Sequence, residues 1–125
     1  MKIFFDGGCR PNPGRMEAAV VAAGQAHILD DLGEGRSEEA EWLALIHALR
    51  IARELERRPG APLVLLGDAA GVVAQANGTA RLRGVGARHF ETFRSLHAEA
   101  GMPRIRHIRR SQNLAGIALA RRHER

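Results

Sequence analysis

Cysteine pairs, long apolar runs and a signal peptide are absent from this chain. Its single cysteine, Cys9, excludes an intramolecular disulfide and cannot form a cysteine metal cluster alone. No apolar run approaches the roughly 18 residues that a membrane-spanning helix needs. The N-terminus also lacks the long apolar region and small-residue cleavage site of a secreted protein. We therefore expect a cytoplasmic protein that has no membrane partner.

The length and composition are those of one folded domain. A chain of 125 residues with 45% hydrophobic residues can bury roughly two-thirds of its unfolded surface in one core. We see no linker, internal repeat or low-complexity segment. The sequence therefore predicts a single domain over residues 1–125, and it gives no indication of the oligomeric state.

The two parts of the chain carry opposite charge. Residues 1–80 hold 8 basic and 11 acidic side chains, whereas residues 81–125 hold 11 basic and 3 acidic ones. A basic region beside an acidic one favours a polyanionic partner such as nucleic acid, because phosphates need to be neutralised next to any metal-binding carboxylates. A solvated, arginine-rich helical surface is the alternative explanation of the same pattern.

Residues 2–14, KIFFDGGCRPNPG, have the pattern of an active-site segment. The apolar run at residues 3–5 predicts a buried strand that ends at Asp6. A loop rich in glycine and proline follows, where glycine lets the backbone approach a ligand and proline stiffens the turn. Asp6 would thus be held on a rigid support beside an open loop.

Two further carboxylates have matching contexts. Glu41 lies in the first turns of a predicted amphipathic helix, and Asp68 follows the buried apolar strand predicted at residues 63–66. Together with Asp6 they provide the oxygen ligands that Mg²⁺ and Mn²⁺ prefer. Each residue taken singly is also compatible with a helix cap or a turn.

The predicted order of elements is β-β-β-α-β-α-α-β-α. Ser37 is the expected N-cap of a helix that presents Trp42 to the core and ends near Arg58, before Pro59 and Gly60. Residues 31–36 are expected to form a loop, and Ser111 to cap the last helix. The other predicted strands are at residues 17–23, 25–30 and 104–109, and the other helices at 71–76 and around 90–97. This is an α/β domain in which a three-stranded antiparallel meander joins a parallel pair.

Four segments resemble the ribonuclease H family, in its compact prokaryotic form. They are DGG-x-R-x-NPG at residues 6–14, AEWLALI-x-AL at 40–49, GD-x-x-x-VV-x-Q-x-NG at 67–78, and HIRR-x-x-N at 107–113 with a later ALA. The resemblance implies a five-stranded mixed sheet flanked by helices. It also implies an endonuclease that hydrolyses the RNA strand of RNA/DNA hybrids with two Mg²⁺ or Mn²⁺ ions about 3.5–4 Å apart.

The same resemblance implies roles for individual residues. Asp6, Glu41 and Asp68 would be the catalytic metal ligands, with Asp6 bridging both ions. Glu41 and the first loop would also recognise the 2′-hydroxyl that distinguishes RNA from DNA. The residues expected to bind substrate are Gly7, Gly8, Cys9, Asn12, Arg110 and Asn113.

One position departs from the family in a way that bears on activity. The family pattern N-x-x-A-D-x-L-A reads NLAGIALA at residues 113–120, so Ile117 stands where a fourth carboxylate is expected. No Asp or Glu occurs between Glu99 and Glu124 to replace it. We therefore expect a weakened or Mn²⁺-favouring enzyme. The alternatives are an inactive module that binds hybrid or duplex RNA, and a domain that works through a protein interface.

Overall fold

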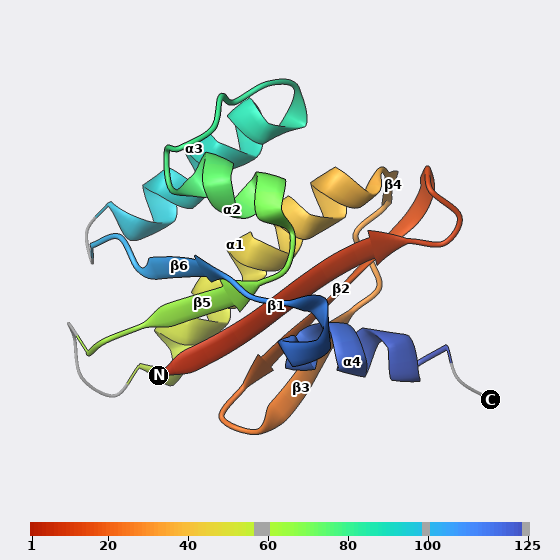
Figure 1. The fold of residues 1–125 in the computed structure, drawn as a ribbon, viewed down its shortest axis with the longest axis horizontal. Helices are drawn as coiled ribbons and strands as arrows, with labels where there is room; N and C mark the ends of the chain where they lie inside the picture. The colour runs from red at the N-terminus through yellow and green to blue at the C-terminus, as the bar shows by residue number, and fades with distance from the viewer. Residues whose placement is uncertain (57–60, 99–100, 124–125) are drawn as a thin grey trace.

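A mixed sheet with the strand order β3-β2-β1-β5-β6 runs through the computed structural model, which describes residues 1–56, 61–98 and 101–123 (Figure 1). β1 pairs antiparallel with β2 and parallel with β5, and β6 continues the parallel pair at the edge. The predicted meander followed by two parallel strands is therefore confirmed. The five strands are β1 (Lys2–Cys9), β2 (Gly14–Ala22), β3 (Gln25–Leu29), β5 (Val64–Gly67) and β6 (Arg104–His107).

Helices cover both faces of this sheet. α1 (Ser37–Leu55) packs on one face with α2 (Ala70–Ala76) and α3 (Val85–His97) beside it, and α4 (Leu114–Arg121) packs on the other. Side chains of β1 alternate between the two, because Ile3 and Phe5 join the core under α1 while Phe4 packs toward α4. No helix in the described part of the chain is both long and apolar enough to cross a membrane.

The strands differ from the predicted ones at their ends. β1 continues through Cys9, so Asp6 lies inside the strand and the prediction of a strand ending at Asp6 was wrong. The reason is that β2 pairs with β1 as far as Cys9, whereas β5 stops pairing at Phe4. A short strand, β4 (Glu34–Gly35), also pairs with the start of β2 in the segment expected to be a loop.

The helix caps differ as well. Ser37 is the first helical residue and not the cap, and its N–H donates to Asn12 Oδ1 at 3.2 Å. α1 ends at Leu55, before the predicted Arg58, which with Pro59 and Gly60 lies outside the described residues. Ser111 lies in a short 3₁₀ turn (Arg110–Gln112), and Asn113 caps α4 in its place.

Candidate active site

Asp6 and Asp68 lie at the same level of two neighbouring parallel strands. Phe4 of β1 pairs with Leu66 of β5, so Asp6 and Asp68 each follow that pair by two residues. Both carboxylates line a hollow of about 470 Å³, and Glu41 of α1 lines it too. The structure thus brings the three predicted carboxylates to one hollow from three different elements.

Gly7 allows Glu41 to come this close. A Cβ atom built on Gly7 would lie 2.2 Å from the Ala40 carbonyl oxygen and 2.7 Å from the Glu41 nitrogen. Only a residue without a side chain lets the first turns of α1 rest directly on β1. Gly7 is buried and also lines the hollow, and the absence of its side chain permits this close approach.

Asn113 fixes Asp68 from beneath. Its side chain is fully buried, and its Nδ2 donates to Asp68 Oδ1 at 2.8 Å and to the Phe5 carbonyl oxygen at 3.0 Å. Its Oδ1 accepts from the Ala115 N–H at 3.1 Å and so caps α4. One buried side chain therefore connects the last helix, the central strand and a candidate catalytic carboxylate.

The negative charges of the three carboxylates repel one another. Burial, with the neighbouring Asp68 carboxylate adding to it, raises the pKa of Asp6 to about 7. Burial and the charges of Asp6 and Asp68 raise the pKa of Glu41 to about 7 as well. The Arg110 guanidinium opposes both shifts. A positive charge placed among these carboxylates would reduce the repulsion between them.

α4 completes the wall of the hollow with apolar atoms. Gly116 and Ile117 both line it, and a Cβ atom on Gly116 would lie at an ordinary contact distance, 3.5 Å, from Asp6 Oδ2. Ile117 is 38% exposed. The position where a family carboxylate was expected thus faces the hollow and carries a hydrocarbon side chain; Glu124 lies outside the described residues.

The residues predicted to bind substrate divide into two groups. Gly7, Gly8, Cys9 and Arg110 line the hollow. A Cβ on Gly8 would meet nothing within 4 Å, so its backbone is open to a ligand. Asn12 instead accepts a hydrogen bond from the Ser37 N–H at the start of α1, and Asn113 is buried. Cys9 Sγ donates to the Gly35 carbonyl oxygen at 3.4 Å, and burial raises the pKa of the thiol.

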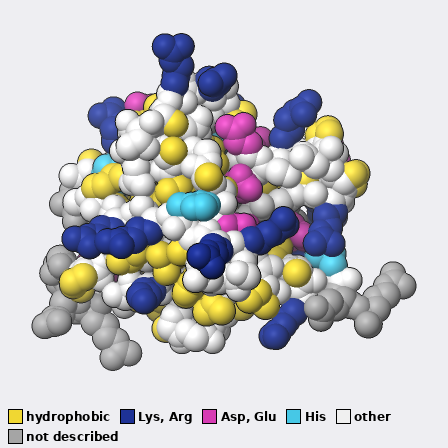
Figure 2. All heavy atoms as spheres, in the orientation of Figure 1, with side chains coloured by type: hydrophobic (Ala, Val, Ile, Leu, Met, Phe, Trp, Pro, Cys, Tyr) yellow, Lys and Arg dark blue, Asp and Glu magenta, His cyan; other side chains and the backbone are white. Residues whose placement is uncertain are grey.

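Sequence reasoning missed Arg10, Ser37 and Glu17, which also line the hollow. Glu17 pairs with Gly8 across β1 and β2, so its side chain leaves the sheet on the same face as Asp6. An acidic residue in a strand whose neighbouring positions are apolar is the signal that could have identified it. Figure 2 shows acidic side chains gathered right of the centre of this face, with Lys and Arg side chains around them.

The residues fit a divalent cation in their chemistry. Asp6, Glu41 and Asp68 supply only oxygen donors, and none of them forms an ion pair with a described residue. However, no three Asp, Glu, His or Cys side chains in the described ranges are placed so that they could hold an ion as they stand. The donor set is suitable, and the side chains would have to converge further on binding.

Comparison with solved structures identifies the fold. Ribonuclease H1 from the halophilic archaeon Halobacterium salinarum is 26% identical, with a TM-score of 0.79 over 94% of this chain and 92% of that one. LC11 ribonuclease H1, solved in complex with an RNA/DNA hybrid, is 21% identical, with a TM-score of 0.77 over 90% and 88%. An N-terminal ribonuclease H domain from Mycobacterium tuberculosis is 24% identical, with a TM-score of 0.73 over 94% and 93%.

Comparison of sequences gives the family. A search of curated protein sequences found no match. The family model described as reverse transcriptase-like matches residues 5–123, which is nearly the whole chain. The predicted resemblance is therefore confirmed: the chain belongs to this reverse transcriptase-like family of ribonuclease H proteins.

Proposed function

We propose that this protein is a metal-dependent endonuclease that hydrolyses the RNA strand of RNA/DNA hybrids. The observation that carries the proposal is the convergence of Asp6, Glu41 and Asp68 on one hollow of a ribonuclease H fold, with Arg110 beside them. LC11 ribonuclease H1, which shares the fold, was solved with an RNA/DNA hybrid bound. That substrate is consistent with the basic second part of this chain.

The three carboxylates would hold Mg²⁺ or Mn²⁺. Such ions, when bound, activate water and stabilise the charge that develops on the leaving oxygen. Asn113 keeps one Asp68 oxygen engaged, which fixes the direction in which the remaining lone pairs point. Because the pKa values of Asp6 and Glu41 are raised to about 7, cation binding would displace protons from them and would strengthen as the pH rises toward 7.

The rest of the hollow would position the substrate. The open backbone at Gly8 would let a ribose or phosphate approach β1 closely. Glu41 and the loop around Gly8 and Asn12 would contact the 2′-hydroxyl of RNA. Arg110 is exposed at the rim, where its guanidinium would neutralise a phosphate. Recognition and hydrolysis would then take place on the same surface.

Ile117 favours a second candidate function, a catalytically inactive module that binds hybrid or duplex RNA. A hydrocarbon side chain in the wall of the hollow offers no ligand, so a cation there would be held by fewer protein oxygens and more water. The same surface would then bind hybrid or duplex RNA without cleaving it.

The test is cleavage of a labelled RNA/DNA hybrid in Mg²⁺ and in Mn²⁺. We expect cleavage, faster in Mn²⁺, that Asp6→Asn reduces at least about 100-fold and that Ile117→Asp increases. Asp31→Asn removes an exposed carboxylate outside the hollow and serves as the matched control. Cleavage that survives Asp6→Asn contradicts the proposed site. Silence in the parent with activity in Ile117→Asp identifies the inactive module.

A further inference from the structure

A second hollow, of about 220 Å³, lies beside the candidate active site. Arg10 and Glu17 line both hollows, so the two are adjacent. The second one extends from that shared wall toward the start of β2, the end of β3 and the residues that follow α4. Its charged lining is Arg10, Arg15, Glu17, Asp30, Arg122 and His123.

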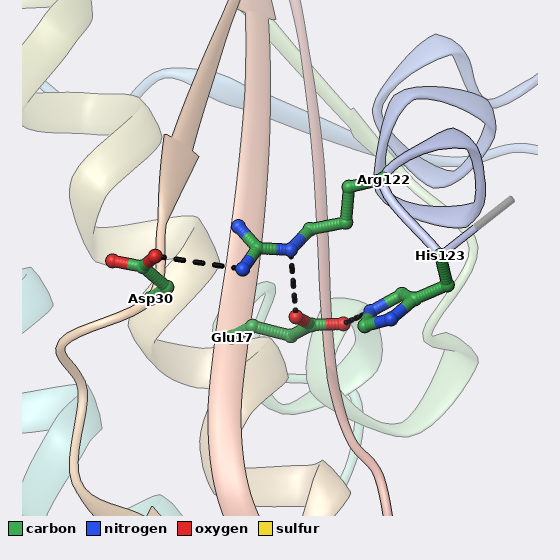
Figure 3. Close-up of polar contacts among 4 residues, drawn as sticks. All are labelled: Glu17, Asp30, Arg122 and His123. Atoms are coloured by element: carbon green, nitrogen blue, oxygen red, sulfur yellow. Dashed lines mark hydrogen bonds and ion pairs between the residues drawn. The ribbon is translucent and has the colours of Figure 1, made fainter. Parts of the chain in front are cut away.

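A buried carboxylate organises this second hollow (Figure 3). Glu17 is only 8% exposed. Its Oε1 lies 2.6 Å from His123 Nε2, and its Oε2 lies 3.3 Å from Arg122 Nε. Arg122 also reaches Asp30, with Nη2 3.4 Å from Oδ2. Glu17 thus holds Arg122 and His123 together from below, and both carboxylate oxygens are already engaged.

The outer edges of these groups remain available to a ligand. About a third of each side chain is exposed, 34% for Arg122 and 32% for His123. Arg10 and Arg15 are exposed, and neither forms an ion pair with a described residue. The lining therefore has three arginines and a histidine but only two carboxylates, and one of these, Glu17, is buried. The accessible part of the lining is cationic.

We propose that this second hollow is a subsite for a backbone phosphate of the nucleic acid strand that leaves the active site. The inference rests on the proposed function, because a strand with its scissile phosphate at Asp6 would reach this hollow by passing Arg10 and Glu17, which line both hollows. Guanidinium groups match phosphate oxygens in geometry and charge. Phosphate contacts of this kind fix the register of a strand without reading its bases.

Glu17 acts here as a positioning residue. A flexible arginine loses side-chain entropy when it binds a phosphate, and prior attachment to Glu17 and Asp30 reduces that loss for Arg122. The subsite would therefore hold the strand in one register relative to Asp6, in a chain whose cation site has lost a carboxylate at position 117.

The first test measures hybrid binding without divalent cations, so that no cleavage occurs. Arg15→Ala should weaken binding roughly five- to tenfold at low salt and reduce the slope of log affinity against log salt by about 1. Arg122→Ala should do the same. Arg53→Ala is the matched control, because it removes one positive charge from the last turn of α1, outside both hollows. Arg15 has no described ion partner, so its variant should keep the parent's stability even if Arg122→Ala does not.

The second test locates the phosphate. Hybrids that carry one neutral methylphosphonate linkage are scanned over several positions on each side of the cleavage site. We expect one or two positions on a single side to weaken binding by the parent and to have no further effect on Arg15→Ala or Arg122→Ala. Two outcomes would overturn the subsite alone, provided that the parent binds the hybrid. One is that Arg15→Ala and Arg122→Ala weaken binding no more than Arg53→Ala does. The other is that both variants show the same methylphosphonate scan as the parent. Parent binding that is undetectable even at low salt overturns the proposed function and the subsite with it.

Discussion

The face of the sheet under α1 and the face under α4 bury different amounts and different kinds of side chain. Under α1 lies a large continuous core in which Trp42, Phe5, Leu45 and Phe93 are almost fully buried. Under α4 the buried cluster is small and consists of Ala19, Ala115 and Leu119. The α4 face instead carries Asp6, the buried Glu17 and the buried Asn113.

This difference indicates how the fold accommodates a site that opposes its stability. Carboxylates with raised pKa values destabilise the folded state near neutral pH, since the charged form is disfavoured where it is buried. The core under α1 supplies the hydrophobic free energy that offsets this cost. α4, which has little apolar area to bury, depends on specific polar contacts made by Asn113 and by Glu17 with the residues after the helix.

The largest effect should come from the α1 face. Trp42→Ala should lower the free energy of unfolding by about 4 kcal/mol, because it opens a large cavity and leaves Gln75 Oε1 without the Trp42 Nε1–H, 3.1 Å away. Leu119→Ala, on the α4 face, should cost about 2 kcal/mol. Urea unfolding of both variants measures the difference. Equal losses would contradict the division of roles between the two faces.

Asn113→Ala should have the next largest effect, about 3 kcal/mol, because it removes a helix cap, one buried hydrogen bond and one partly buried hydrogen bond at once. The loss should be local to α4. Hydrogen exchange should accelerate at the α4 amides and leave those of α1 near the parent's rates. Asn77→Ala, which removes one hydrogen bond to the Ile105 carbonyl oxygen, is the control and should cost about 1 kcal/mol. Uniform acceleration across α1 and α4 would mean that the two faces unfold together.

Much of the fold follows from local patterns in the sequence. The apolar stripe of α1 and the short apolar run of β5 identify those elements, since burial alone dictates their composition. The caps could not be predicted in the same way. The Ser37 N–H is bonded by Asn12 from 25 positions earlier, and Asn113 caps α4 because Asp68 and Phe5 hold its side chain in place.

The site shows a similar limit. The carboxylates at positions 6, 41 and 68 could be grouped from their sequence contexts and from the resemblance, and the structure places them around one hollow. The positions of these side chains relative to one another could not be predicted, because they depend on how closely α1 approaches Gly7. Glu17 was missed because its partners, Arg122 and His123, lie more than a hundred residues away in the chain. Contacts of that separation have no local signature.

The smallest of the three main effects is expected from Asp6→Asn. This variant tests how the carboxylate charges affect the stability of the α4 face. In the folded parent the pKa of Asp6 is about 7, raised by burial and by Asp68, whereas its unfolded value is about 4. The folded state therefore binds more protons than the unfolded state between these values, so parent stability should fall as the pH rises from about 4 to about 7 and then level off.

Asn carries no charge at any pH, so the variant should escape this part of the loss. Because Asp6 is only partly buried, we expect Asp6→Asn to be more stable than the parent by about 2 kcal/mol at pH 8 and equal to it near pH 4. Addition of Mn²⁺ should reverse the order at pH 8, since a cation that binds all three carboxylates stabilises the parent more than a variant that keeps two of them. Chemical denaturation at the two pH values, with and without Mn²⁺, measures both effects. A gain of the same size at pH 4 and pH 8 would mean that packing, and not charge, sets the stability of this face.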